Sequence, residues 1–101
     1  MKYTTNEVRS GLEFHIIGDF IYNDHDEFLE IVKKIKKAEY EKMYLNFSEC
    51  NFLDSAAMGM LVIASDAANE CGVKLAIKGA KDRVKRVLYA ARFDTIFNIE
   101  E

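Results

Sequence analysis

The chain has 101 residues, of which 50% are hydrophobic and 31% charged, with a formal net charge of −3. This length allows one domain with a single core and excludes a separate cofactor domain. The slightly acidic balance argues against nucleic acid as a partner. The first residues lack the apolar segment of a signal peptide, and no run approaches the roughly 18 apolar residues of a membrane span. We therefore expect a soluble, cytoplasmic domain that does not associate with membranes.

The first two predicted elements are strands. Strands are predicted over residues 3–8 and 12–17, and the second is the clearer one, because its apolar and polar residues alternate with the period of a strand that has one buried face. The short connection around Gly11 fits a β-hairpin. We expect the second strand to end at Gly18.

A helix is predicted over residues 24–38. Asp24 followed by Glu27 resembles a capping box in which Asp24 is the N-cap. Acidic residues near the start and lysines near the end match the helix dipole, so we assign them to capping and solvation rather than to a cation or nucleic acid. The apolar stripe has helical spacing and consists of Phe28, Ile31, Val32 and Ile35.

The rest of the chain alternates strands with helices. Strands are predicted over residues 43–47 and 73–77, and helices over residues 55–70 and 80–91. Helical spacing predicts that Val84, Val87, Leu88 and Ala91 form the inner face of the last helix. A short apolar segment at residues 95–99 is either a packed tail or an edge strand. Strands separated by helices need crossover connections and lie parallel, whereas the opening hairpin is antiparallel. The predicted fold is α/β, with a mixed, mostly parallel sheet of four to five strands and three to four helices.

The sequence lacks the common motifs of catalysis and cofactor binding. Cys50 and Cys71 form neither a Cys-x-x-Cys pair nor part of a histidine cluster, so we expect two reduced thiols and no metal site. The five glycines match no nucleotide-binding motif. His15 and His25 accompany no serine or cysteine nucleophile motif. We predict no cofactor, no catalytic residue and no enzymatic activity.

The junction at residues 51–61 is the candidate functional site, because a strand pattern gives way there to a helix pattern across Asp54 and Ser55. Ser55 lies at or next to the helix N-cap. The first half of this helix is apolar on nearly every side, so it is either wholly buried or partly exposed to a partner. In the second case Met58 and Met60 are the candidates for an adaptable protein-binding surface.

The order of these motifs resembles that of the STAS domain family, which includes the bacterial anti-sigma factor antagonists. The resemblance rests on the Asp-Ser turn at residues 52–59, the glycine and strand at 72–77, the helix at 84–88 and the phenylalanine segment at 92–97. It covers essentially the whole chain and is most specific from Met43 onward. It implies that residues 1–101 form one STAS domain.

The resemblance also implies a function and its residues. A family member binds a serine-kinase anti-sigma factor while unphosphorylated, is released when that kinase phosphorylates it, and is restored by a PP2C-type phosphatase. Ser55 matches the phosphorylated serine, and Asp54 belongs to the switch loop. The implied output is bacterial signal transduction and transcription regulation by a monomer or weak homodimer. The candidate partner-binding residues are Ala57, Met58, Gly59, Met60 and Asp24.

Two departures from the family pattern and one alternative function stay open. Ala57 replaces a usual glycine, and the usual acidic residue after the second strand falls near Ile21, with Asp24 close by. The alternative is a constitutive scaffold subunit that docks a transporter, receptor or signalling enzyme, with Ser55 acting only as a cap. An enzyme is the third and least favoured class.

Overall fold

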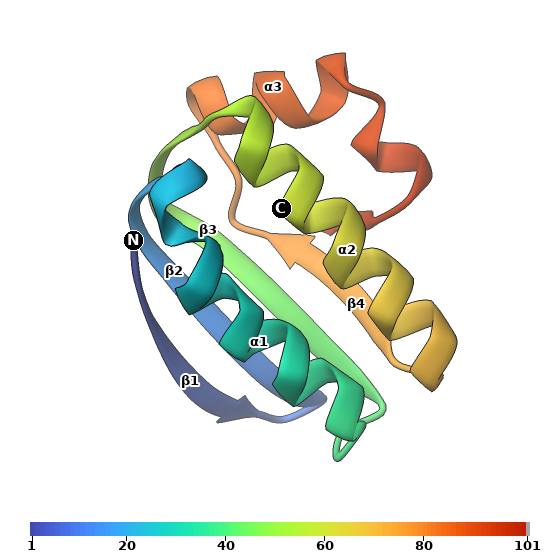
Figure 1. Cartoon of the computed structure of the whole chain (residues 1–101). Coiled ribbons are helices and arrows are strands. Elements are labelled where there is room, and N and C mark those ends of the chain that lie inside the picture. Colours follow the sequence, from blue (N-terminus) through green and yellow to red (C-terminus); the bar gives the residue numbers. More distant parts are fainter. Residues whose placement is uncertain (101) are drawn as a thin grey trace.

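Residues 1–100 are described by a computed structural model, in which the strands form one sheet with helices packed on it (Figure 1). The order of strands in the sheet is the order in the chain. β1 is antiparallel to β2, and every later neighbouring pair is parallel. The predicted mixed, mostly parallel sheet and the opening hairpin are therefore confirmed. The strands are β1 (Lys2–Val8), β2 (Gly11–Phe20), β3 (Lys42–Leu53), β4 (Lys74–Lys78) and β5 (Asn98–Glu100).

The helices lie on one face of the sheet and at one of its ends. α1 and α2 cover the face, and α3 lies beside the start of α2 (Figure 1). The last apolar segment contains the edge strand β5, which decides between the two predicted alternatives. The helices are α1 (His25–Lys37), α2 (Ser55–Cys71) and α3 (Asp82–Ala90), with 3-10 turns η1 (Tyr22–Asp24) and η2 (Phe93–Thr95).

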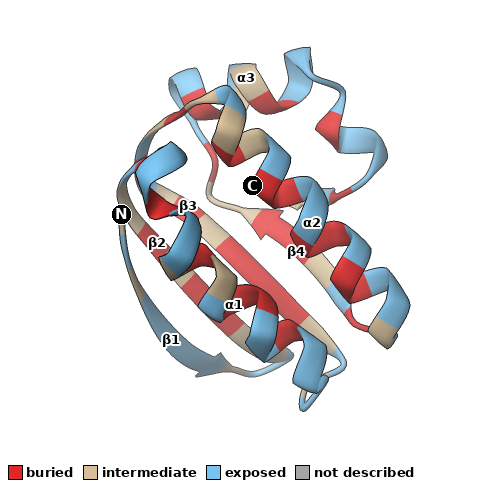
Figure 2. Cartoon of the chain, viewed as in Figure 1, coloured by how far each residue is buried: buried red, intermediate tan, exposed pale blue. Residues whose placement is uncertain are grey.

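The hydrophobic core lies between the sheet and the helices α1 and α2 (Figure 2). Phe14 of β2, Leu45 and Phe47 of β3 and Ile77 of β4 are fully buried there. The predicted stripe of α1 supplies the opposite wall. Small side chains bring α2 close to the sheet, because they add little volume at the contact. These small buried residues of α2 are Ala57, Ala64, Ala67 and Ala68.

Two strands continue past their predicted ends. β2 passes through Gly18, whose φ of +89° is accessible to glycine, and β3 continues beyond residue 47. The β2–β3 register shifts between Gly18 and Asp19, which breaks the simple alternation that periodicity detects. As a result, β2 and β3 end as neighbours at Phe20 and Leu53, directly before the candidate site.

The capping box predicted at the start of α1 is wrong. Asp24 is the N-cap residue, but its side chain makes no capping hydrogen bond. Its carboxylate accepts instead from the backbone N–H of Ile21 at 2.8 Å and from the Met1 ammonium at 2.6 Å. Asp24 is consequently buried, with 8% of its surface exposed.

The helix predicted over residues 80–91 is shorter than predicted, and fewer of its residues face the core. It begins at Asp82, and only Val84 and Leu88 of its predicted inner face are buried. Val87 is half-buried and Ala91 is exposed. The prediction that Ala91 packs inward is wrong, because α3 covers the end of the sheet rather than the middle of its face (Figure 1).

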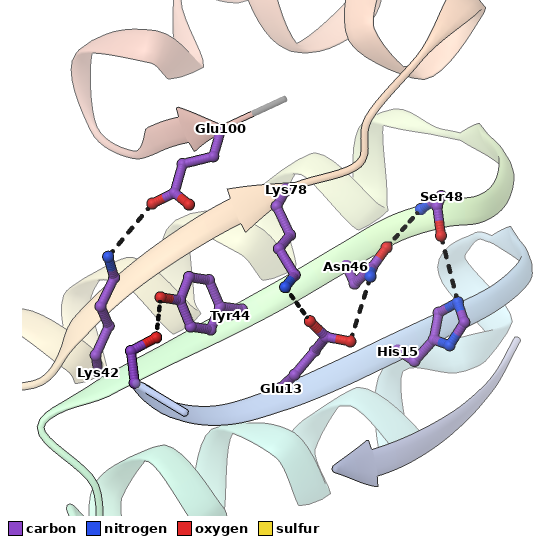
Figure 3. A network of polar contacts seen from close by, with 9 residues as sticks. Glu13, His15, Lys42, Tyr44, Asn46, Ser48, Lys78 and Glu100 are labelled. Carbon is purple, nitrogen blue, oxygen red and sulfur yellow. Dashed lines mark hydrogen bonds and ion pairs between the residues drawn. The ribbon is translucent and has the colours of Figure 1, made fainter. Parts of the chain in front are cut away.

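A polar cluster occupies the opposite face of the sheet, which no helix of residues 1–100 covers (Figure 3). The Lys78 ammonium lies 2.5 Å from Glu13 Oε1, and Asn46 Nδ2 donates to Glu13 Oε2 at 3.3 Å. The ammonium groups of Lys42 and Lys78 lie 5.0 and 4.8 Å from the centre of the Tyr44 ring. Only 6% of Tyr44 is exposed, so the two lysine side chains replace a covering helix.

The carboxylate of Glu13 is held in its charged form. Burial raises the pKa of Glu13, but hydrogen bonds from Lys78 and Asn46 together lower it more, so the pKa lies below its usual value. The folded state therefore binds a proton at Glu13 less readily than the unfolded chain, whose glutamate pKa is about 4.3. The resulting stabilisation is present above that value and is lost as the pH falls through the folded-state pKa.

We expect Glu13→Gln to lower the free energy of unfolding by about 1–3 kcal/mol at pH 7, because Lys78 loses its charged partner. Urea unfolding at pH 7 and pH 3 measures this, and the difference from the wild type should shrink at the lower pH. Glu49→Gln is the matched control. The Glu49 side chain is 60% exposed, and its contact with His15 Nε2 is long, at 4.0 Å. A loss for Glu13→Gln that is the same at both pH values would contradict the argument.

Candidate functional site

Asp54, rather than Ser55, caps helix α2. Asp54 has an extended backbone, with φ −95° and ψ 178°, and its Oδ1 accepts from the backbone N–H of Ala57 at 2.8 Å. This is the usual N-cap geometry, in which a side-chain oxygen satisfies the third helical N–H. Ser55 is the first residue of α2. It lies next to the N-cap, which was one of the two predicted positions.

The same carboxylate also holds the turn after β2. Asp54 Oδ2 accepts from the backbone N–H of Tyr22 at 2.9 Å. The backbone N–H of Asp54 donates to the carbonyl of Phe20 at 3.4 Å. Asp54 therefore joins the end of β2, the turn η1 and the start of α2. The sequence analysis missed Tyr22, whose side chain is 71% exposed at this junction.

Ser55 presents its hydroxyl to solvent at the positive end of the α2 dipole. Within residues 1–100 that hydroxyl has no hydrogen-bond partner. No hydrogen bond between Ser55 and Asp54 is present in residues 1–100, and each Asp54 carboxylate oxygen accepts from a backbone N–H instead. The arrangement leaves Ser55 exposed beside the capped start of α2.

The predicted partner-binding residues differ in how far they are buried. Met60 is 5% exposed and Ala57 is fully buried, so the prediction that they contact a partner is wrong: their side chains pack in the core. Asp24 is also wrong as a free contact residue, because it is buried against the Met1 ammonium. Met58 is half-buried and Gly59 is exposed, so both remain predictions.

A shallow apolar groove lies between the start of α2 and the end of α3. Its volume is about 530 Å³. The contribution of α3 was not predicted from the sequence, because helical spacing alone places Val87 and Ala91 in the core. We call this feature the α2–α3 groove, and its walls are formed by Leu53, Asp54, Ser55, Met58, Val87, Ala90 and Ala91. Farther along α2, Val62 and Ile63 are 39% and 46% exposed.

The described residues hold no arrangement typical of a metal centre. No group of three or more histidine, cysteine or acidic side chains in residues 1–100 is placed to bind an ion. Burial raises the pKa of the Cys50 thiol, which disfavours the thiolate that metals bind. No helix in this part of the chain is long and apolar enough to cross a membrane.

Comparison with known proteins gives a family match and several structural neighbours. The family model of the STAS domain matches residues 2–101. A STAS-domain containing protein of Pseudomonas aeruginosa is 23% identical over 88 residues, which are 87% of this chain and 86% of the relative. Both matches span nearly the whole chain, so they concern the complete fold rather than a single motif.

Solved structures with the same fold include anti-sigma factor antagonists and a transporter domain. An anti-sigma factor antagonist from Mycobacterium paratuberculosis has a TM-score of 0.85 at 9% identity, covering 98% of this chain and 84% of that one. Unphosphorylated SpoIIAA, an anti-sigma factor antagonist, has a TM-score of 0.69 at 13% identity, covering 87% of this chain and 82% of that one. A structure of phosphorylated Bacillus SpoIIAA is similar too. The STAS domain of a SulP transporter from Vibrio cholerae has a TM-score of 0.74 at 17% identity, with coverage of 86% and 70%. These likenesses show the fold.

We expect Asp54→Ala to lower the free energy of unfolding by about 1–2 kcal/mol, because two backbone N–H groups lose their acceptor. Amide hydrogen exchange should accelerate at Tyr22 and Ala57. Asp54→Asn retains one side-chain acceptor and should show a smaller loss. Unchanged exchange at both amides in Asp54→Ala would contradict the role assigned to the carboxylate.

Proposed function

The chain belongs to the STAS domain family, and from this we propose that it is an anti-sigma factor antagonist-like regulator switched by phosphorylation of Ser55. One observation carries the proposal: the exposed hydroxyl of Ser55 lies at a helix start, on the wall of an apolar groove. A hydroxyl in this position is accessible to a kinase and also borders a surface suited to a protein partner.

In the proposed unphosphorylated state, the α2–α3 groove binds a serine-kinase anti-sigma factor and thereby frees a sigma factor. Met58 and Gly59 contribute contacts from α2, and the α3 wall adds Val87 and Ala90. Burial of these apolar side chains favours association. The proposed setting is the cytoplasm of a bacterium, and the chain acts there as a monomer or weak homodimer without a cofactor.

Phosphorylation ends this complex by a local change of charge. A phosphoryl group adds about −1.5 to −2 charges, which the start of α2 tolerates but the neighbouring Asp54 repels. An apolar partner surface would also have to desolvate it. A cost of about 3 kcal/mol weakens binding more than a hundredfold. A PP2C-type phosphatase restores the binding state, and the chain itself is a substrate rather than an enzyme.

A second candidate is a constitutive scaffold subunit that docks a transporter, receptor or signalling enzyme. The likeness to a transporter STAS domain and the exposed side chains of Val62 and Ile63 support it. In this alternative Ser55 is only a surface residue beside the cap.

We expect a purified serine-kinase anti-sigma factor from the native host to transfer phosphate from ATP to Ser55. Intact-mass analysis followed by phosphopeptide mapping measures the transfer. Ser10 is the internal control, because it is also exposed but its hydroxyl is 2.6 Å from the Tyr44 hydroxyl. Phosphate on another residue, or none with any such kinase of the host, argues against the proposal.

Binding separates the two candidates. In a pull-down from host lysate, wild-type protein and Ser55→Ala should retain a histidine-kinase-like ATPase. Ser55→Asp should retain about tenfold less of this ATPase, or less still. Asn69→Asp adds the same charge at the far, exposed end of α2 and should retain it. A scaffold subunit gives the opposite pattern, in which Ser55→Asp binds normally and Val62→Asp does not.

A further inference from the structure

Helix α3 carries exposed positive charge in a chain whose net charge is −3. Arg83 and Arg86 are both exposed. Residues four apart are neighbours on a helix surface, so Arg83 precedes Val87 and Arg86 precedes Ala90 on the face that lines the α2–α3 groove. The apolar wall of the groove is therefore continued along α3 by two guanidinium groups.

A second hollow extends the groove along the same edge. It has a volume of about 280 Å³, and it is lined by two cations, Lys81 and Arg83, and one acidic residue, Asp82, together with Cys50 and Asn51 of β3. β3 then continues from Asn51 to Leu53, which lines the α2–α3 groove. The two hollows thus follow one another along the end of β3; the first is mainly apolar, and the second carries two cations against one acidic residue.

We propose that this surface binds an acidic, amphipathic segment of a partner protein. The apolar side of the segment packs on Met58 and Val87, and its carboxylates pair with Arg83 and Arg86. Arginine suits this role because its planar guanidinium can pair with a carboxylate through two hydrogen bonds. A basic segment would be repelled, and a wholly apolar one would leave both arginines without partners.

This inference deepens the proposed function, because the groove borders Ser55, and it explains why a phosphate there opposes binding. The acidic segment and a phosphate on Ser55 carry the same sign of charge and share one groove wall. The phosphate also competes for the guanidinium groups that the segment needs. Repulsion and competition act together, without a change of fold.

The test uses the whole chain and two synthetic peptides, and no kinase. Both are helical, about 14 residues long, with leucine at i, i+3, i+4 and i+7 spacing; the other positions carry glutamate in one peptide and lysine in the other. Fluorescence anisotropy should show that the glutamate peptide binds about tenfold more tightly than the lysine peptide, or tighter still. This difference should decrease in high salt, because salt screens the charges. Nuclear magnetic resonance shifts should map its binding to Met58, Val87 and Ala90.

Matched charge variants locate the interaction. Arg83→Glu/Arg86→Glu should weaken glutamate-peptide binding about tenfold, and Arg83→Gln/Arg86→Gln should weaken it less. Lys33→Glu/Lys37→Glu makes the same charge change on the exposed face of α1 and should leave binding unchanged. Circular dichroism confirms that each variant is folded.

Four results would overturn the inference: equal binding of both peptides, no effect of the α3 variants, shifts confined to α1, or tighter binding of a single-stranded oligonucleotide at the groove. Because no kinase is present, these results are independent of Ser55 phosphorylation. If a kinase phosphorylates Ser55 while the peptides are not distinguished, the inference fails and the proposed function stands.

Discussion

The carboxylate of Asp54 is the contact on which the geometry of the site depends. One oxygen accepts from the N–H of Ala57 in α2, and the other accepts from the N–H of Tyr22 in η1. Neither backbone segment fixes the other directly at these positions. A single side chain therefore caps the start of α2 and holds the backbone of the turn at Tyr22, so it links the two segments that flank the site.

The sheet that carries this junction is stabilised differently on its two faces. The helix-covered face holds the apolar core, whereas the uncovered face is closed by the Glu13–Lys78 pair and by lysine side chains over Tyr44 (Figure 3). The second face needs no further layer of helices. α3 lies at the end of the sheet beside the start of α2, and its last residues line the groove together with those of α2 (Figure 1).

The sequence predicted most of the fold and the location of the site, because periodicity and the family pattern are both encoded locally. It did not predict the full length of β3, since the shifted register with β2 interrupts the alternation. It also assigned Met60 to the surface, because an apolar helix has no spacing that distinguishes its buried face. The role of Asp54 depends on Tyr22, which is distant in sequence, so local patterns carry no sign of it.

The capping arrangement also explains why the proposed switch acts on binding rather than on folding. Asp54 already caps the N–H of Ala57, so the start of α2 does not depend on a phosphate at Ser55 for its side-chain cap. Ala57 and Met60 of α2 are buried in the core, whereas Ser55 is exposed. The added charge therefore remains on the wall of the groove, where its main effect is on whatever partner approaches that wall.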